Sequence, residues 1–535
     1  MPKKTKYIVI TGGVLSGLGK GIFTSSLGKL LQSRGFRVVP IKIDPYVNVD
    51  AGTMNPIEHG EVFVLDDGSE VDMDLGTYER FLDINLRSEN NITTGKIYDR
   101  VIEREREGKY LGKTVQIIPH ITDEVQDWLG NIAKGYNAEI VLVEIGGTVG
   151  DIENLVFLEA CRQFSIKEDV IFIHCTLVPV ISVVGEQKTK PTQQSVQKLR
   201  EIGILPHFLF CRSPEPLKPK IKAKISLFCG IPEENVISGP DLDSIYKVPL
   251  ILEEQGVTQK VLKKLGLQPK KKDMKEWEDF VNRMGNARKT VNIAITGKYT
   301  ELHDSYVSIM ESLKASCGNL GVKLGIKWIE TTDIENKKLK VSDALKGMNG
   351  IIVPGGFGPR GTEGKMECIR YARENKIPFL GLCYGFQLAT LEFARNRCGL
   401  AKANSTEIDP KTPHAVIDLL PEQRKVYKKG GTMRLGGHDV IIKKGTLAHR
   451  IYGSLKARER FRHRWEFVPA YTGKLECKGL VFSGHDKSGK IMQILELPKH
   501  PFFMASQFHP EFTTRVLKPN PLFLNFIKAA SKKSG

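Results

Sequence analysis

One cysteine has the surroundings of a nucleophile. Cys383 lies in the stretch FLGLCYGFQLA, after an apolar run and before a helix-like pattern. This order of strand, tight turn and helix is typical of a nucleophile elbow, with Gly381 and Gly385 where side chains would obstruct the turn. A helix N-terminus also favours the thiolate, the reactive form of cysteine. A buried structural thiol is the ordinary alternative for a cysteine considered alone.

Partners for this thiol can be named from the same half of the chain. The segment SQFHPEF offers His509 as a general base and Glu511 as the carboxylate that orients it. The backbone N–H of Tyr384 would face an oxyanion, and Gly356, in the glycine-rich loop VPGGFGPRG, could supply a second N–H. Together these residues favour a thiol nucleophile over a buried structural cysteine.

A second chemical site is indicated near the amino terminus. The stretch YIVITGGVLSGLGKGIF predicts a strand, a glycine-rich turn that cradles phosphate, and a helix that starts near Lys20. It departs from the usual phosphate-loop pattern, since Val14 replaces a glycine and Gly21 replaces the hydroxyl residue that holds magnesium. We therefore expect the metal ligands elsewhere, at Asp74 and at Glu144, which ends an apolar strand. A glycine turn that merely packs a helix on a strand is the structural alternative.

The composition of the chain bounds its class. With 535 residues it exceeds what one hydrophobic core supports, so about two large domains are expected. The net charge of +18 is dispersed, which favours a phosphate-bearing small substrate over nucleic acid. Nine cysteines without a C-x-x-C pair suit neither a zinc cage nor a disulfide framework. With no signal-peptide core and no long apolar run, a cytoplasmic protein without a membrane partner is predicted.

The elements that must position these residues alternate regularly. Short β-branched runs such as YIVIT, EIVLVE, VNIAIT and IPFLGLC alternate with amphipathic stretches, which predicts α/β domains with largely parallel sheets. After about residue 400, GGTMRLGGHDVIIKK predicts antiparallel hairpins added to the second domain. The expected boundaries are a first domain at 1–268, a linker helix at 269–289 and a second domain at 290–535. The polar stretch GEQKTKPTQQSVQ, residues 185–197, is predicted to be a loop before a helix, and alone it decides nothing about function.

Long motifs along the whole chain resemble one family. The amino half carries TGGVLSGLGKG, KIDPYVNVDAGTMNPIEHGEVFV, DLGTYERF, EIGGTVGDIE and KTKPTQ, and the carboxyl half carries GKYTELHDSY, PGGFG, GLCYGFQ, ANSTE, GTMRLG, RHRWE and FHPEF. In this order they resemble the CTP synthase family of glutamine-dependent amidoligases. The resemblance implies an α/β fold with a P-loop-like, Rossmann-type amidoligase domain and an α/β class I glutamine amidotransferase domain.

The resemblance also implies a reaction and its first set of residues. ATP would phosphorylate O4 of the uracil ring of UTP, and ammonia from glutamine would displace the phosphate to give CTP. Lys42 would lie near the transferred phosphoryl group, and Mg²⁺ would be held by Asp74 and Glu144. The residues implied for ATP are Gly17, Leu18, Gly19, Lys20, Gly21, Ile22, Asp74, Pro240, Asp241 and Leu242. Those implied for UTP, or for CTP as product inhibitor, are Ser16, Asp151, Ile152, Glu153, Lys188, Thr189, Lys190, Pro191, Thr192, Gln193 and Lys224.

For the second domain the resemblance implies hydrolysis of glutamine by Cys383, His509 and Glu511. Glutamine would be held by Gly356, Tyr384, Gly385, Phe386, Gln387, Glu407 and Arg464. Because neutral ammonia is protonated in bulk water, an internal passage is expected. The residues that match the family's gate for it are Asn55, Pro56, His59 and Val62. The family further implies a homotetramer with UTP sites at subunit interfaces and activation by GTP.

A few positions depart from the family pattern. Gly17 stands where a second serine is more frequent, Tyr384 and Phe386 where Leu and Met are common, and Pro240 where a lysine is frequent. These departures bear on affinity more than on the reaction. Two other functions compete: a related amidoligase such as a cobyric-acid-type synthase, and a non-catalytic, partitioning-type P-loop ATPase polymer with a relic amidotransferase. The segments KTKPTQ and DPYVNVD favour the UTP enzyme over the first, and the intact Cys383, His509 and Glu511 set argues against the second.

Overall fold

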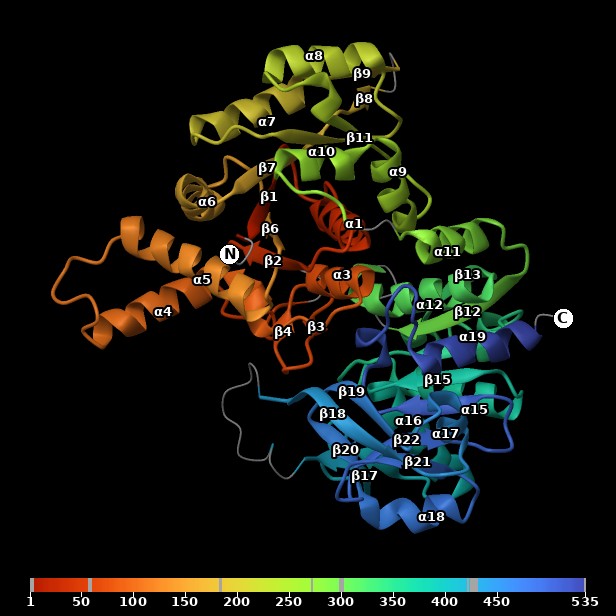
Figure 1. The fold of residues 1–535 in the computed structure, drawn as a ribbon. Coiled ribbons are helices and arrows are strands. Elements are labelled where there is room, and N and C mark those ends of the chain that lie inside the picture. Colours follow the sequence, from red (N-terminus) through yellow and green to blue (C-terminus); the bar gives the residue numbers. More distant parts are fainter. Residues whose placement is uncertain are drawn as a thin grey trace. The chain divides into compact units, whose positions relative to one another are not determined.

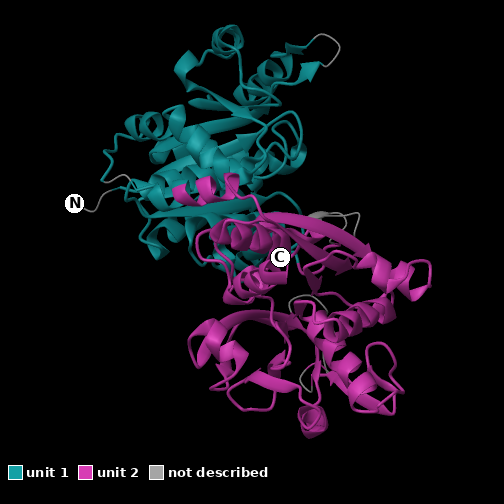
Figure 2. Cartoon of the chain, turned by 90° about the vertical axis from the view of Figure 1, so that its right-hand side faces the viewer, with its two compact units in different colours: residues 1–51, 74–278 teal, residues 52–73, 279–535 magenta. Residues whose placement is uncertain are grey.

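The computed structural model of the chain divides into two compact units. One unit comprises residues 1–51 and 74–278, and the other comprises residues 52–73 and 279–535 (Figure 2). The residues that the structure describes are 4–55, 60–181, 185–270, 273–297, 303–420, 423 and 432–533. No helix within these ranges combines the length and the apolar character that a bilayer crossing requires.

The first unit is built on a parallel sheet, as the alternation of elements predicted. Among its described residues, seven strands pair in the order β11-β10-β7-β1-β6-β2-β5 (Figure 1). Strands β2 and β6 are buried along their whole length, which explains their continuous apolar runs. A small antiparallel pair, β8 and β9, lies apart from this sheet. The strands are β1 (Lys6–Gly12), β2 (Val38–Asp44), β5 (Asn91–Thr93), β6 (Ile140–Ile145), β7 (Val170–Leu177), β8 (Val180–Ile181), β9 (Glu186–Gln187), β10 (Phe208–Ser213) and β11 (Val236–Pro240).

Helices connect these strands in the right order for βαβ units. Helix α1 follows the glycine loop directly, and its Phe23, Leu27, Leu30 and Leu31 are all buried. The helices are α1 (Lys20–Ser33), α3 (Met73–Leu82), η1 (Ser88–Asn90), α4 (Thr94–Arg106), η2 (Ile117–Ile121), α5 (Thr122–Gly135), η3 (Ile152–Asn154), α6 (Leu155–Lys167), α7 (Lys190–Glu201), α8 (Pro219–Cys229), η4 (Glu233–Asn235), η5 (Ile245–Lys247), α9 (Val248–Glu254) and α10 (Val257–Lys264).

The second unit has a mixed sheet. In the part of the chain that is described, its strand order is β13-β12-β14-β15-β23-β22-β21-β18-β19, parallel as far as β23 and antiparallel beyond it (Figure 1). The predicted antiparallel pairing of the late strands is confirmed, since β18 and β19 pair antiparallel at the edge of this sheet, although a short helix and not a tight turn connects them. The strands are β3 (Phe63–Val64), β4 (Glu70–Val71), β12 (Thr290–Gly297), β13 (Lys323–Glu330), β14 (Gly350–Val353), β15 (Phe379–Leu382), β16 (Ala403–Ser405), β17 (His414–Leu419), β18 (Arg434–Ile442), β19 (Lys456–His463), β20 (Trp465–Phe467), β21 (Val481–His485), β22 (Met492–Glu496) and β23 (Phe503–Ser506).

Two apolar clusters hold the helices of the second unit on the sheet. The helices are η6 (His303–Tyr306), α12 (Val307–Leu320), α13 (Thr331–Glu335), α14 (Val341–Ala344), α15 (Thr362–Glu374), α16 (Tyr384–Arg397), α17 (Leu447–Tyr452), η8 (Pro469–Tyr471), α18 (Thr472–Glu476), η9 (Pro510–Phe512) and α19 (Pro521–Lys533). The linker segment forms α11 (Lys275–Gly285), whose Trp277 packs on Phe81 and whose Phe280 lies against Gly318.

One expectation about local structure was wrong. Residues 185–197 were predicted to be a loop, but α7 already begins at Lys190. Pro191 lies in the first turn of this helix, where its fixed φ is suitable and its missing N–H has no partner to lose. Proline therefore marked a helix start here and not a loop.

Candidate active sites

The turn at Cys383 is a strained elbow between β15 and α16. Cys383 has φ 49° and ψ −95°, a conformation that L-residues adopt only when the surroundings enforce it. Its N–H donates to the carbonyl oxygen of Ser506 at 2.7 Å. A Cβ at Gly385 would lie 2.2 Å from the carbonyl oxygen of Val353, so only glycine fits there. The sequence therefore places the thiol at the carboxyl end of a central parallel strand.

His509 and Glu511 follow the neighbouring strand. Because β23 runs parallel to β15, the residues after both strands meet at the same edge of the sheet. His509 Nδ1 bonds Glu511 Oε1 at 2.7 Å. Burial alone would lower the pKa of His509, but Glu511 and Cys383 raise it to about 10. Glu511 and Cys383 therefore favour the protonated imidazole, while His509 Nε2 is buried without a hydrogen-bond partner among the described residues.

The sulfur atom has two further contacts that the sequence did not reveal. Cys383 Sγ donates to the carbonyl oxygen of Arg462 at 3.6 Å. Gln507 Nε2, which is buried, donates to the same sulfur at 3.6 Å. Gln507 Oε1 accepts in turn from Gln387 Nε2 at 3.4 Å. The only signal in the sequence was that Gln507 lies two residues before His509 in the segment SQFHPEF.

The residues expected to hold glutamine differ in where their side chains lie. Gln387 donates to the carbonyl oxygen of Trp465 at 2.8 Å, while its own Oε1 is buried without a partner among the described residues. An orphaned acceptor beside the nucleophile is suited to a substrate amine or amide N–H. The ring of Phe386 instead packs in the hydrophobic core, so only its backbone can serve the site.

The other expected glutamine residues are held by loop contacts. Glu407 Oε1 accepts from the N–H of Gly358 at 3.0 Å, which ties it to the glycine loop that includes Gly356. Tyr384 OH donates to the Gly358 carbonyl oxygen at 3.0 Å. Arg464 donates to Gln423 Oε1 at 2.6 Å and to Thr432 Oγ1. These contacts fix the positions of the three side chains.

The phosphate loop of the first unit follows β1. Gly17 and Gly19 have φ of 74° and 83°, and even Val14 has φ 84°, so the loop takes the left-handed conformations that glycine favours. Ser16 and Leu18 lie in the same loop. Lys20 starts α1 and donates to the Gly147 carbonyl oxygen at 2.9 Å, and burial lowers its pKa. The loop thus brings a helix N-terminus and a partly desolvated cation to one place.

A cluster of opposite charges lies beside this loop. Lys42 Nζ donates to Glu144 Oε1 at 2.9 Å and also to Asp74 Oδ2. Burial alone would lower the pKa of Lys42, but Asp74 and Glu144 raise it well above its ordinary value. Burial, and then Glu144, raises the pKa of Tyr78, which donates to Glu144 Oε2 at 2.5 Å. The ammonium group of Lys42 therefore forms ion pairs with both carboxylates.

These carboxylates fit a magnesium ion. A Cβ at Gly21 would lie 2.3 Å from Asp74 Oδ1, so the Asp74 carboxylate occupies the space that a hydroxyl residue would fill at that position. This explains the departure from the usual phosphate-loop pattern. The described residues contain no group of three or more possible metal-binding side chains. Two carboxylates leave the remaining positions to phosphate oxygens and water, the arrangement that Mg²⁺ favours with nucleotides.

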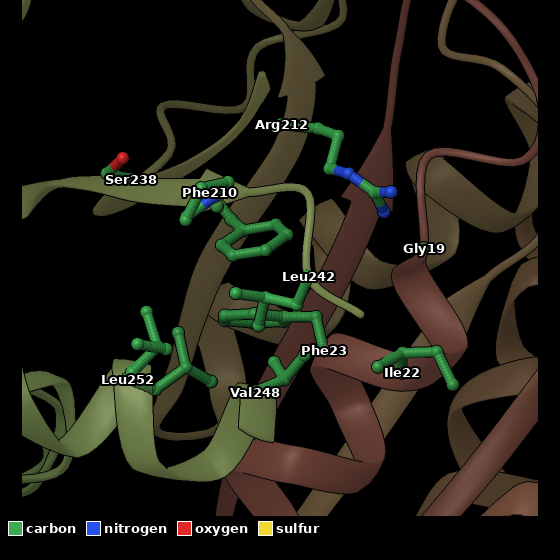
Figure 3. Close-up of a pocket in the computed structure, with 12 residues that line it drawn as sticks. Gly19, Ile22, Phe23, Phe210, Arg212, Ser238, Leu242, Val248 and Leu252 are labelled. Atoms are coloured by element: carbon green, nitrogen blue, oxygen red, sulfur yellow. The ribbon is translucent and has the colours of Figure 1, made fainter. Parts of the chain in front are cut away.

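An apolar pocket opens next to Gly19 (Figure 3). Figure 3 shows Phe23 and Phe210 on one side of it, with Leu242 and Val248 near them. The rings of Phe23 and Phe210 lie 4.6 Å apart. The residues that line the pocket are Gly19, Ile22, Phe23, Phe210, Arg212, Ser238, Gly239, Pro240, Leu242, Val248, Ile251 and Leu252. Of the expected ATP residues this set includes Gly19, Ile22, Pro240 and Leu242, and Asp241 accepts from Arg212 at 2.7 Å beside them.

The residues expected for UTP and CTP are scattered and mostly accessible. Thr189 and Thr192 are buried at the start of α7, where Gln193 Nε2 donates to Thr189 Oγ1 at 2.9 Å. Lys188 forms an ion pair with Glu186, while Lys190 and Pro191 lie in the first turn of α7. Ile152 is 82% exposed, and Asp151, Glu153 and Lys224 are also exposed. The chain by itself does not enclose a nucleotide here.

A buried histidine links the phosphate loop to α7. His174 Nδ1 shares a hydrogen bond with Thr11 Oγ1 at 2.8 Å, and its Nε2 shares one with Ser195 Oγ at 2.7 Å. Burial, and secondarily Lys20, lowers the pKa of His174 to about 3, so the ring is neutral. Of the expected gate residues, Val62 is buried and Asn55 is exposed, while Pro56 and His59 lie outside the described residues.

Taken together, a phosphate loop with paired carboxylates in one unit and a thiol, imidazole and carboxylate in the other define a two-unit amidotransferase enzyme. The family model for the CTP synthase N-terminus matches residues 6–267, and the model for class I glutamine amidotransferases matches residues 301–529. The chain belongs to the CTP synthase family, a family of ligases that use ATP.

Individual relatives agree with this placement. A CTP synthase of Archaeoglobus fulgidus is 56% identical over 530 residues, 98% of each chain. A CTP synthase of Thermococcus gammatolerans is 56% identical over 533 residues, 99% of each chain. Among solved structures, the chain is similar to a Trypanosoma brucei CTPS glutaminase domain with bound acivicin, with 36% identity, a TM-score of 0.42, and coverage of 45% of this chain and 94% of that one.

Proposed function

We propose that the protein makes CTP from UTP, ATP and glutamine. The second unit hydrolyses glutamine to glutamate and ammonia. The first unit transfers the γ-phosphoryl group of ATP to O4 of UTP, and ammonia displaces the phosphate at C4. The observation that carries the proposal is that one chain of this family holds both a complete thiol site and a phosphate loop with a lysine between two carboxylates.

At the thiol site, Cys383 acts as the nucleophile on the side-chain amide of glutamine. The cationic His509, oriented by Glu511, donates its proton to the leaving nitrogen, so that ammonia departs and a glutamyl thioester remains. His509 then accepts a proton from the water that hydrolyses the thioester. Backbone N–H groups at Tyr384 and in the loop of Gly356 stabilise the oxyanion. Gln387, Glu407 and Arg464 hold the glutamine.

At the phosphate site, catalysis is mainly positioning and charge stabilisation. The glycine loop and Lys20 hold the phosphates of ATP, and the pocket of Figure 3 holds its base. Asp74 and Glu144 would hold Mg²⁺, which neutralises charge on the phosphates when bound. Lys42, which lies between these carboxylates, would stabilise the transferred phosphoryl group. O4 becomes a leaving group only after this phosphorylation.

The oligomeric state, the regulation by CTP and GTP, the delivery of ammonia and the cellular location are part of the same proposal. The exposure of Asp151, Ile152, Glu153 and Lys224 supports UTP and CTP sites that a second copy of the chain completes, within a homotetramer. CTP would inhibit as product, and GTP would activate. Ammonia is delivered internally because bulk water would protonate it. A cytoplasmic location is supported by nine cysteines that are all unpaired.

The deciding experiment measures CTP formation from UTP and Mg-ATP, with glutamine or with ammonium, for wild type and Cys383→Ala. We expect wild type to use both nitrogen sources. The variant should lose the glutamine reaction by roughly 10³-fold or more and keep the ammonium reaction. Failure of wild type to form CTP from either source would remove the UTP assignment, and nucleotide-dependent polymerisation without CTP would favour an assembly protein instead.

A further inference from the structure

Two cysteines of the second unit meet at the ends of neighbouring helices. Cys398 directly follows the last residue of α16, and Cys477 directly follows the last residue of α18. These two helices are in contact. Cys398 Sγ donates to the carbonyl oxygen of Lys474 at 3.4 Å, and Cys477 Sγ donates to the same oxygen at 3.2 Å. The distance between the two sulfur atoms therefore cannot exceed the sum of these two contact distances.

The pair differs from the other cysteines in accessibility. Cys477 is exposed and Cys398 is partly exposed, whereas the remaining seven are buried. Among those seven, burial raises the pKa of Cys161 and of Cys368 to about 12, so these thiols stay protonated and unreactive. Burial raises the pKa of Cys398 as well, and Cys477 adds to this shift. Cys383 apart, the pair comprises the thiols that a solute can reach.

We propose that Cys398 and Cys477 form an oxidisable dithiol that hydroperoxides convert to a disulfide. The exposed sulfur of Cys477 attacks a peroxide oxygen, the O–O bond breaks, and a sulfenic acid and one water result. The sulfur of Cys398 then attacks the sulfenic sulfur, forms the S–S bond and releases the second water. Two thiols lose two protons and two electrons, and one hydrogen peroxide gains them to give two waters.

Formation of the bond requires the two sulfur atoms to move toward each other. An S–S bond needs the sulfur atoms closer together than they are while both contact Lys474. Both residues cap helix ends, and the N–H of Cys477 still donates to the carbonyl oxygen of Gly473 at 3.1 Å, so the movement falls mainly to the two side chains. Gly479, with φ 97°, follows Cys477 after one residue and adds freedom to that side.

The disulfide would restrain the helix that follows the nucleophile. Helix α16 begins directly after Cys383, and its far end would be joined to α18. The disulfide would close a loop of about 80 residues, a length for which the entropy of the unfolded chain falls substantially. This loop includes Glu407 and Arg464. The expected result is a more stable glutaminase unit under oxidising conditions. The inference does not depend on the reaction that the enzyme catalyses.

The test treats the reduced, full-length protein with hydrogen peroxide, alkylates the remaining thiols and maps the peptides by mass spectrometry. We expect a Cys398–Cys477 linked peptide, an intact mass lower by two hydrogens before alkylation, and reversal by dithiothreitol. The Tm of the second unit should rise by roughly 5 °C or more. Cys398→Ser and Cys477→Ser should each abolish the link and the rise in Tm.

Two controls separate the pair from other thiols. Cys368→Ala removes a buried cysteine of the same unit and should keep the link, and Cys383→Ala should keep it too, which excludes oxidation of the nucleophile as the cause. Dibromobimane, which joins two nearby thiols, should become fluorescent on the reduced wild type and on neither Ser variant. Oxidation of Cys477 to sulfinic acid without a link, a link to another cysteine, or a link without a change in Tm would overturn the proposal.

Discussion

The two sites differ in how complete they are in the free chain. At the thiol site, Cys383 is held in a strained turn, His509 is already ion-paired with Glu511, and both follow strands of one sheet. At the proposed phosphate site, Lys42 forms ion pairs with both Asp74 and Glu144, the proposed metal ligands. The first site therefore has its proposed catalytic groups in place, whereas in the second the proposed metal ligands are ion-paired with a lysine.

The chemistry of each site explains this difference. A covalent nucleophile reacts only when the attacking atom, the proton carrier and the oxyanion donors are in place beforehand, so backbone strain is tolerated at Cys383. Phosphoryl transfer depends on charges that would be unstable if left buried and unpaired. Lys42 is buried, and its pairing with two carboxylates compensates for the burial of its charge.

The largest expected effect is that of replacing the two carboxylates of the first unit, which should impair CTP formation but not glutamine hydrolysis. Asp74→Asn and Glu144→Gln should each lower CTP formation by roughly 100-fold or more, with glutamine and with ammonium alike, because each removes a metal-binding carboxylate. Glutamine hydrolysis, measured as glutamate release, should remain. This pattern is the opposite of that expected for Cys383→Ala.

A loss confined to the glutamine reaction would contradict the assignment of Asp74 and Glu144. Since either change also leaves Lys42 with a weaker partner, folding must be checked by the thermal transition of each variant. A well-folded variant that retains full ammonium-dependent synthesis would place the metal elsewhere.

The next effect tests how the thiolate is held. Gln507→Leu removes the amide N–H that contacts Cys383 Sγ, and Gln507→Glu replaces it with a carboxylate that repels a thiolate. We expect kcat/KM for glutamine to fall by roughly 10-fold and 100-fold respectively, with ammonium-dependent synthesis unchanged. The pH profile of Cys383 alkylation by iodoacetamide should move to higher pH in the same order. Equal losses with an unmoved profile would show that Gln507 is only structural.

A matched pair of ion pairs tests the hairpin of β3 and β4, which belongs to the second unit. Glu70 bonds Arg462 at 2.7 Å and is almost fully buried, whereas Asp66 bonds Arg458 at 2.8 Å in a more accessible position. Arg462 also supplies the carbonyl oxygen that the Cys383 thiol contacts. Glu70→Gln should cost about 3 kcal/mol of unfolding free energy and lower glutaminase activity, because it leaves a largely buried charge uncompensated.

Asp66→Asn is the control for that change, because it lies on the same hairpin and removes the same kind of interaction. It should cost at most about 1 kcal/mol and leave glutaminase activity unchanged. Denaturant unfolding and glutamate release measure both quantities. If the two variants behaved alike, the hairpin would contribute to stability without positioning the Arg462 carbonyl.

The sequence predicted the candidate reactive residues more successfully than the residues that contact them. The elbow at Cys383 and the loop before Lys20 are local motifs, in which glycines at fixed spacing determine the turn, so their strand and helix contexts were predicted. The contact between Lys42 and Glu144 depends on register, since β2 and β6 place these two residues side by side. No spacing within either strand reveals that pairing.

Other features depend on tertiary packing alone. Gln507 contacts Cys383 because β23 lies beside β15, and the hairpin at residues 63–71 joins the second unit although it comes from the amino half of the chain. Phe210 and Val248 line the pocket beside Gly19 from segments without any phosphate motif. The start of α7 at Lys190 was missed because proline was interpreted as a loop residue.

The last expected effect concerns pH and again distinguishes the thiol site. The folded-state pKa of His509, about 10, exceeds its ordinary value of 6.5, so protonation stabilises the folded state. This stabilisation is complete below pH 6.5 and is lost as the pH rises toward 10. Between pH 7 and pH 9 it should fall by about 2 kcal/mol, measured by denaturant unfolding. Glu511→Gln removes the main group that raises this pKa, so its unfolding free energy should fall less over the same interval. Parallel pH profiles for wild type and variant would mean that His509 is not held as a cation in the resting site.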